Sequence, residues 1–96
     1  LRAPMVGHLG DGNFHVILPY DPKEEGTYDK IRDFSDLLIN KTLELNGTIT
    51  GEHGVGLHKK AYLLKEHGDS IPLMKSIKKS IDQNNIMNPG KIFDLN

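Results

Sequence analysis

The sequence lacks cysteine, long apolar runs and any excess of one charge, and each absence excludes a class of structure. Without cysteine there can be no disulfide and no thiolate ligand, so any bound metal must use His, Asp, Glu or water. The longest apolar runs are only a few residues, so no membrane span or signal peptide is visible. With 12 basic and 13 acidic residues, the net charge of −1 is too small to attract nucleic acid.

Apolar side chains are also scarce, at 36% of the 96 residues. A chain of this length forms one small domain of modest stability, because it buries only roughly 60–70% of its unfolded surface. The chain begins with Leu1 rather than Met, so we expect a segment of a longer protein. We expect this segment to be soluble, and either cytoplasmic or peripheral to an energy-transducing membrane.

The first twenty residues predict two strands joined by a glycine-rich turn. Residues 16–18 (VIL) have strand character, and residues 10–13 (GDGN) have turn chemistry. Residues 48–50 (TIT) are a third, short strand candidate. So little strand cannot form a robust sheet by itself, and we expect strands from missing sequence or from a partner to complete it.

Three helices follow from the spacing of apolar residues. The first begins either at Asp21-Pro22 or at Gly26-Thr27 and ends at Asn46-Gly47. The second covers about residues 57–67, and the third begins near Ser70. The predicted buried stripe of the first helix is Ile31, Phe34, Leu38, Thr42 and Leu45, and that of the third is Ile71, Met74, Ile77 and Ile81. On the third helix, the residues predicted to face water are Lys75, Lys78, Lys79 and Asp82.

This order of elements predicts an α+β fold with a small antiparallel sheet and helices packed on one face. The fold would be part of a larger domain.

Two glycine-rich segments hold three of the five histidines. In the first, residues 7–15 (GHLGDGNFH), His8 and His15 are seven residues apart, a spacing that puts them on opposite faces of an unbroken strand. The intervening glycines allow a bulge or tight turn, after which both imidazoles can converge on a metal ion.

The second segment, residues 50–56 (TGEHGVG), offers a carboxylate beside an imidazole. Glu52 can supply an oxygen ligand, which leaves His53 to act as a general base near neutral pH. Two histidines, one carboxylate and open positions are typical of a catalytic metal site. The simpler interpretation is that the glycines only make turns and that the histidines, His58 and His67 above all, are surface or satisfied residues.

Three motifs in order, residues 7–15, 51–56 (GEHGVG) and 88–91 (NPGK), resemble the C-terminal region of FAD-linked oxidases of the vanillyl-alcohol-oxidase type. The resemblance covers about residues 7–93. It is to the branch that includes glycolate oxidase, D-lactate dehydrogenase and D-2-hydroxyglutarate dehydrogenase.

The resemblance implies a role for each motif residue. His8, His15 and Glu52 would bind a divalent metal, zinc or a similar ion, and His53 would be the catalytic base. Asn13 would bind substrate, and Asn88 and Lys91 would contact the cofactor. Residues 1–87 would then be the substrate-domain portion, and residues 88–96 a tail that returns to the flavin domain.

The implied reaction is the oxidation of a D-2-hydroxy acid (lactate, glycolate or 2-hydroxyglutarate) to the 2-oxo acid, with hydride passing to FAD. The partners would be an N-terminal FAD-binding domain of the same parent chain and a downstream electron acceptor; a homo-oligomer is a further expectation. Two other interpretations are a stand-alone metallohydrolase and an inert association module.

Overall fold

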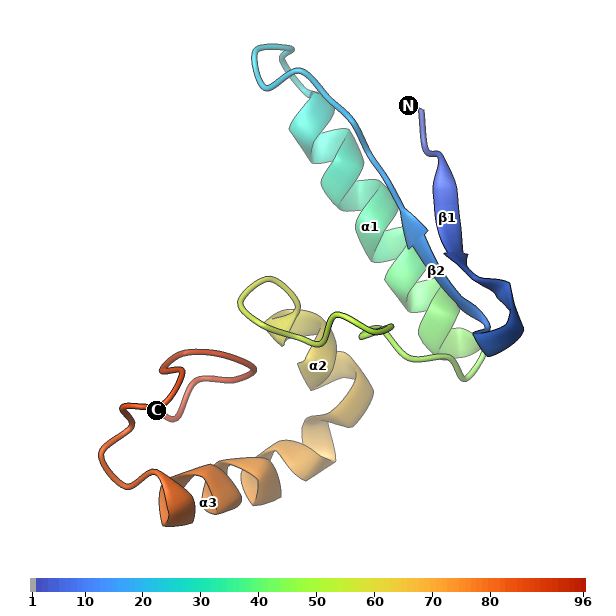
Figure 1. Ribbon diagram of the computed structural model, residues 1–96. Helices are drawn as coiled ribbons and strands as arrows, with labels where there is room; N and C mark the ends of the chain where they lie inside the picture. The colour runs from blue at the N-terminus through green and yellow to red at the C-terminus, as the bar shows by residue number, and fades with distance from the viewer. Residues whose placement is uncertain (1) are drawn as a thin grey trace. The chain divides into compact units, whose positions relative to one another are not determined.

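The structure, a computed structural model, describes residues 2–96 and divides into two compact units (Figure 1). Unit 1 extends to Gly47 and holds strands β1 (Met5–His8) and β2 (Asn13–Val16), with the 3-10 turn η1 (Leu9–Asp11) between them, and helix α1 (Thr27–Glu44). Unit 2, Thr48–Asn96, holds helix α2 (Lys60–His67), the 3-10 turn η2 (Gly68–Ser70) and helix α3 (Ile71–Ile81). The predicted α+β class and antiparallel sheet are confirmed.

The sheet of unit 1 is an antiparallel hairpin that pairs Met5 with Val16 at one end and His8 with Asn13 at the other. The chain reverses through η1, where Gly12 adopts a left-handed φ of 68° and its amide donates to the carbonyl of Leu9 (3.1 Å). This confirms the predicted turn. Strand β2 ends at Val16, although a hydrogen bond from the Ile17 amide to the Pro4 carbonyl (2.9 Å) continues the pairing.

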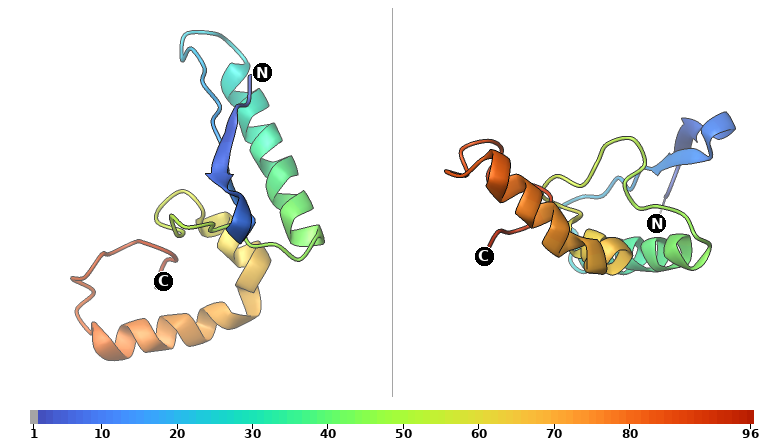
Figure 2. Two further views of the ribbon diagram at one scale, coloured as in Figure 1. Left: turned by 45° about the vertical axis from the view of Figure 1, so that its right-hand side comes forward. Right: turned by 90° about the horizontal axis from the view of Figure 1, so that it is seen from below.

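Helix α1 begins at Thr27, so the second of the two predicted starts is correct. Asp21 does not cap the helix because its carboxylate accepts a hydrogen bond from the Lys23 amide (2.9 Å), which makes a local turn instead. At the other end, the helix stops at the predicted place, but Asn46 and not Gly47 takes the left-handed conformation, with a φ of 62°. The helix runs along one face of the hairpin (Figures 1 and 2).

Unit 2 departs from the prediction at its first segment, because residues 48–50 do not form a strand. The backbone groups of Ile49 are bonded to side chains, Glu66 on one side and Lys59 on the other, where a strand would need a neighbouring backbone. Helix α2 starts at Lys60, three residues later than predicted. Helix α3 has Pro72 in its first turn, as predicted, and the chain after it folds back toward the loop that precedes α2 (Figure 2).

The buried apolar core of the described residues is small and lies in unit 2, where it consists of Ile49, Leu63 and Ile71. The predicted stripe of α3 is therefore only partly core: Ile77 is 52% exposed and Ile81 is 76% exposed. Leu45, predicted to be buried, is also exposed. These residues were predicted from helical periodicity, which identifies an apolar face but not whether the same chain covers it. Within residues 2–96, no helix has the length and apolar character needed to cross a bilayer.

Asp82 was predicted to face water and is instead buried, so that prediction is wrong. Its carboxylate accepts hydrogen bonds from the Lys78 ammonium and from the amides of Ile86 (3.0 Å) and Met87 (2.9 Å). The Lys78 hydrogen bond, aided by these two amides, outweighs the effect of burial and lowers the pKa of Asp82. Asp82 thus fixes the turn that follows α3.

Candidate functional site

The hairpin of unit 1 depends on a close approach of two backbones at Gly7. A Cβ atom at this position would lie 2.6 Å from the Cα of Phe14 and would also overlap the carbonyl oxygen of Asn13. Only glycine fits without moving one strand away from the other. The first glycine of residues 7–15 is therefore a packing requirement of the strand pair.

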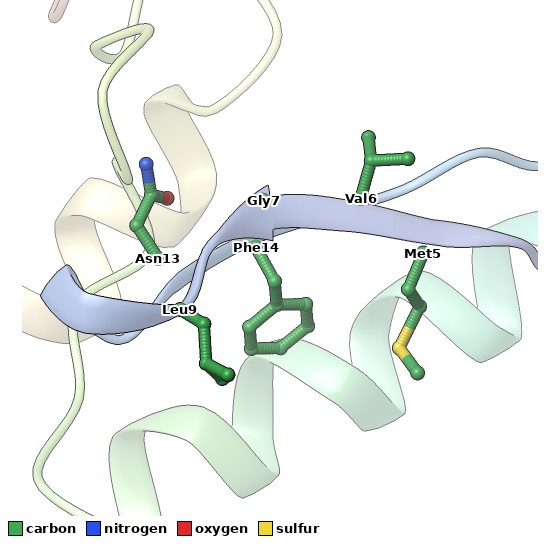
Figure 3. Close-up of a pocket in the computed structure, with 6 residues that line it drawn as sticks. All are labelled: Met5, Val6, Gly7, Leu9, Asn13 and Phe14. Carbon is green, nitrogen blue, oxygen red and sulfur yellow. The ribbon is translucent and has the colours of Figure 1, made fainter.

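The register of the hairpin places His8, Asn13 and His15 on one face. His8 pairs directly with Asn13, and His15 pairs with Val6. Paired residues share a face and alternate residues share a face, so all four side chains project to the same side of the sheet. Figure 3 shows Asn13 and Val6 on this side. Although His8 and His15 are an odd number of residues apart, the turn between the strands puts them on one face. There they are diagonal neighbours.

The opposite face of the hairpin is apolar. Met5, Leu9 and Phe14 project from it toward α1 (Figure 3). These side chains, with Val6, Gly7 and Asn13, line an open cavity of about 430 Å³. All three are more than half exposed, and Leu9 is 95% exposed. Unit 1 therefore separates a polar face with the candidate ligands from an apolar face.

Glu52 and His53 lie in a loop of unit 2 whose glycines have left-handed backbones. Gly51 has a φ of 53° and Gly54 a φ of 77°, and these two residues flank the acid and the histidine directly. A side chain at either position would be strained. The Nε2 atom of His53 lies 3.7 Å from the Oε1 atom of Glu52, and both side chains are well exposed, His53 at 71%. The loop thus presents a carboxylate beside an imidazole.

Sequence reasoning missed two residues that bind the start of this loop. Glu66, in the last turn of α2, accepts hydrogen bonds from the Ile49 amide (2.8 Å) and the Thr48 hydroxyl (2.9 Å). The Nζ atom of Lys59 donates to the Ile49 carbonyl (3.1 Å). One signal was present: a carboxylate is disfavoured at the C-terminal end of a helix, so Glu66 needed another reason to be there.

The two remaining histidines, His58 and His67, are not among the predicted site residues. His58 is exposed. The Nε2 atom of His67 lies 2.7 Å from the Oε2 atom of Glu66, and the imidazole is about half exposed. His67 is therefore a satisfied residue, in agreement with the simpler interpretation of that position.

The C-terminal tail of unit 2 forms a tight turn at residues 88–91. Asn88 and Gly90 both have left-handed backbones, with φ of 47° and 76°, and the amide of Lys91 donates to the carbonyl of Asn88 (3.3 Å). The next residue, Ile92, donates its amide hydrogen to the carbonyl of Gly56 (2.8 Å). The tail with the predicted cofactor contacts is thus bonded to the loop that holds Glu52 and His53.

The protein family described as "FAD linked oxidases, C-terminal domain" matches residues 1–92 of the sequence.

Individual relatives agree with this match. The chain is 43% identical over 96 residues to a probable mitochondrial D-lactate dehydrogenase of Danio rerio. It is 47% identical over 90 residues to the mitochondrial "D-lactate dehydrogenase (cytochrome) 1" of Saccharomyces cerevisiae, and 42% identical over 88 residues to the glycolate oxidase subunit GlcD of Bacillus subtilis. These alignments include 99%, 93% and 91% of the chain but only 19%, 15% and 19% of the relatives. The chain therefore spans less than a fifth of the length of each of them.

Proposed function

Because the chain belongs to the family of FAD linked oxidases, C-terminal domain, we propose that it is the metal- and substrate-binding part of a flavin-dependent dehydrogenase. The reaction would oxidise a D-2-hydroxy acid of the lactate, glycolate or 2-hydroxyglutarate type to the 2-oxo acid. The names of the relatives support this substrate class. The observation that carries the proposal is the shared hairpin face of His8, Asn13 and His15.

The side-chain types proposed as metal ligands suit a divalent ion. In this proposal His8 and His15 would supply imidazole nitrogens from diagonal positions of the hairpin, and Glu52 would supply a carboxylate from the second glycine-rich loop. Two imidazoles and one carboxylate are a ligand set typical of catalytic zinc, in which a further position stays open for substrate. A bound zinc ion would supply Lewis acidity, which lowers the pKa of a coordinated hydroxyl group.

His53 is the proposed catalytic base. Its imidazole is largely exposed and therefore accessible to a substrate, and histidine is the side chain that most often serves as a general base. The Oε1 atom of the neighbouring Glu52 lies 3.7 Å from the Nε2 atom of His53. Asn13 lies on the same face as the two hairpin histidines, where its amide can hydrogen-bond a hydroxy acid.

The proposed cofactor contacts are Asn88 and Lys91 in the tail. FAD would be bound mainly by an N-terminal domain of the parent protein and would supply the hydride acceptor. The left-handed turn at residues 88–91 presents backbone and side-chain polar groups in a short segment, which fits a contact role but cannot enclose a flavin ring. Residues 1–87 would form the substrate portion and residues 88–96 the return to the flavin domain. A downstream acceptor would reoxidise the flavin.

The intact protein that contains this chain tests the proposal. Purified protein should show a flavin absorption spectrum, and anaerobic addition of a D-2-hydroxy acid should bleach it. The L-enantiomer serves as the matched control, because the metal and base sites fix which face of the substrate carbon meets the flavin. An intact protein that lacks flavin, or that hydrolyses esters or amides with a metal but oxidises no hydroxy acid, would contradict the proposal.

A further inference from the structure

Both backbone groups of Ile49 are bonded to side chains of α2 and the residue before it. The amide donates to the Oε1 atom of Glu66 (2.8 Å), and the carbonyl accepts from the Nζ atom of Lys59 (3.1 Å). The Ile49 side chain is itself buried, with 5% of its surface exposed. Ile49 is therefore held in three ways: through its amide, through its carbonyl and through its buried side chain.

Glu66, which binds the Ile49 amide, is largely buried and carries a negative charge. Its side chain is 10% exposed, and it accepts further hydrogen bonds from the Thr48 hydroxyl (2.9 Å) and the His67 ring (2.7 Å). Burial alone would raise the pKa of Glu66, but the hydrogen bonds from Ile49 and Thr48 and the neighbouring His67 outweigh it and lower the pKa. The carboxylate is thus ionised at neutral pH and satisfied by groups of its own unit.

The loop with Glu52 and His53 is bonded at both ends. At its start, Ile49 is three residues before Glu52, and an extended chain of that length spans at most about 10 Å. At its end, the carbonyl of Gly56 accepts the hydrogen bond from Ile92 (2.8 Å). The glycines inside the loop allow many backbone conformations, so the hydrogen bonds at its two ends restrict the segment.

We propose that Glu66, together with Lys59, is a positioning residue that fixes the loop from which Glu52 and His53 project. This inference rests on the proposed function of those two residues. Glu66 does not touch substrate or metal in this account, because its oxygens already accept hydrogen bonds from Thr48, Ile49 and His67. It acts through the geometry of the loop. A misplacement of a reacting group by about 1 Å can cost on the order of 10²-fold in rate.

The test compares Glu66→Ala and Glu66→Gln in the intact flavoenzyme. Glu66→Ala removes the acceptor of the Ile49 amide and should lower the rate of flavin reduction at saturating substrate by about 10²-fold. Glu66→Gln keeps one acceptor oxygen and should recover most of that rate. Ile71→Ala is the matched control, because it removes a buried side chain of the same unit without touching the bonds to residues 48–50. It should lower the denaturation midpoint while the rate per folded molecule stays near the original.

Hydrogen exchange provides a readout that does not depend on the reaction. The Ile49 amide and the amides of residues 51–54 should exchange faster in Glu66→Ala than in the original protein, and Glu66→Gln should restore protection. Unchanged exchange in Glu66→Ala, or an equal fall in rate in Ile71→Ala, would overturn the positioning role. An original protein that oxidises no hydroxy acid would contradict the proposed function instead, and the exchange result would still decide whether Glu66 fixes the loop.

Discussion

The amide of Ile92 donates a 2.8 Å hydrogen bond to the carbonyl of Gly56, which joins the C-terminal tail to the loop that presents Glu52 and His53. A second link lies close by in the sequence, since the Nζ atom of Lys60 is 2.8 Å from the Oδ1 atom of Asp94. Unit 2 therefore carries the proposed base and the proposed cofactor contacts on segments that are bonded to each other.

The proposed metal ligands are tested by elemental analysis of the intact protein. His8→Ala, His15→Ala and Glu52→Ala should each reduce the content of bound divalent metal, because each removes one donor atom from the proposed set of three protein ligands. His58→Ala is the matched control: the residue is exposed, lies outside the proposed site and should leave metal content unchanged. If all three ligand variants retained the full metal content, the assignment would be wrong.

Gly7→Ala should weaken metal binding although it removes no ligand. The added Cβ would overlap the opposite strand at Asn13 and Phe14, so the strands must separate and the face with both histidines must distort. The cost in unfolding free energy should be about 1–3 kcal/mol, the usual range for overpacking. Denaturant unfolding and metal analysis of the same sample measure the two effects.

Gly10→Ala is the control for that substitution, because a Cβ at Gly10 meets no atom within 4 Å. It should leave the unfolding free energy and the metal content close to their original values. If Gly7→Ala and Gly10→Ala had the same unfolding free energy and metal content, the close approach at Gly7 would not shape the site.

Acid should destabilise the folded chain. The pKa values of Glu66 and Asp82 are both lowered in the folded state from their ordinary values of 4.5 and 3.8. A lowered carboxyl pKa adds stability above the unfolded pKa, and that stability is lost as pH falls through the folded pKa. The denaturation midpoint should therefore be insensitive to these groups near pH 7 and should fall as the pH drops below about 4.5.

Glu66→Gln and Asp82→Asn should each flatten this dependence, since neither amide titrates. Denaturant unfolding between pH 7 and pH 3 measures the midpoint for the original chain and both variants. A midpoint that rises as the pH falls would contradict the direction of both shifts.

The isolated 96-residue chain should bind no FAD and oxidise no D-lactate. Its described residues bury few apolar side chains, and the hairpin face of Met5, Leu9 and Phe14 is open, which favours self-association. A visible spectrum recorded after addition of FAD, an assay with an artificial electron acceptor and light scattering measure these properties. Stoichiometric flavin binding, or turnover above background, would place the boundary of the active site elsewhere.

What could be predicted from the sequence were the features that local chemistry determines. The turn at residues 10–13, the end of α1 near Asn46 and the start of α3 beside Pro72 all follow from residues with restricted or permissive backbones. The alternation of the two strands also explains how His8 and His15 reach one face, once the turn between them is known.

What could not be predicted were contacts between residues distant in sequence. Residues 48–50 have the composition of a strand, yet Glu66 and Lys59 satisfy the backbone of Ile49 from residues 17 and 10 positions away. Asp82 follows a helix face with several lysines, and only the fold shows that its carboxylate accepts hydrogen bonds from the amides of Ile86 and Met87. Periodicity predicted the apolar face of α3 but not the exposure of Ile77 and Ile81.

The most direct test of the account is flavin reduction in the His53→Ala variant of the intact protein, measured by anaerobic rapid mixing with a D-2-hydroxy acid. Metal content is determined on the same sample. The account predicts near-normal metal content and a rate of flavin reduction lower by on the order of 10²–10⁴-fold, the usual contribution of a general base. Loss of the metal together with the rate would make His53 a ligand, and an unchanged rate would contradict its role as the base.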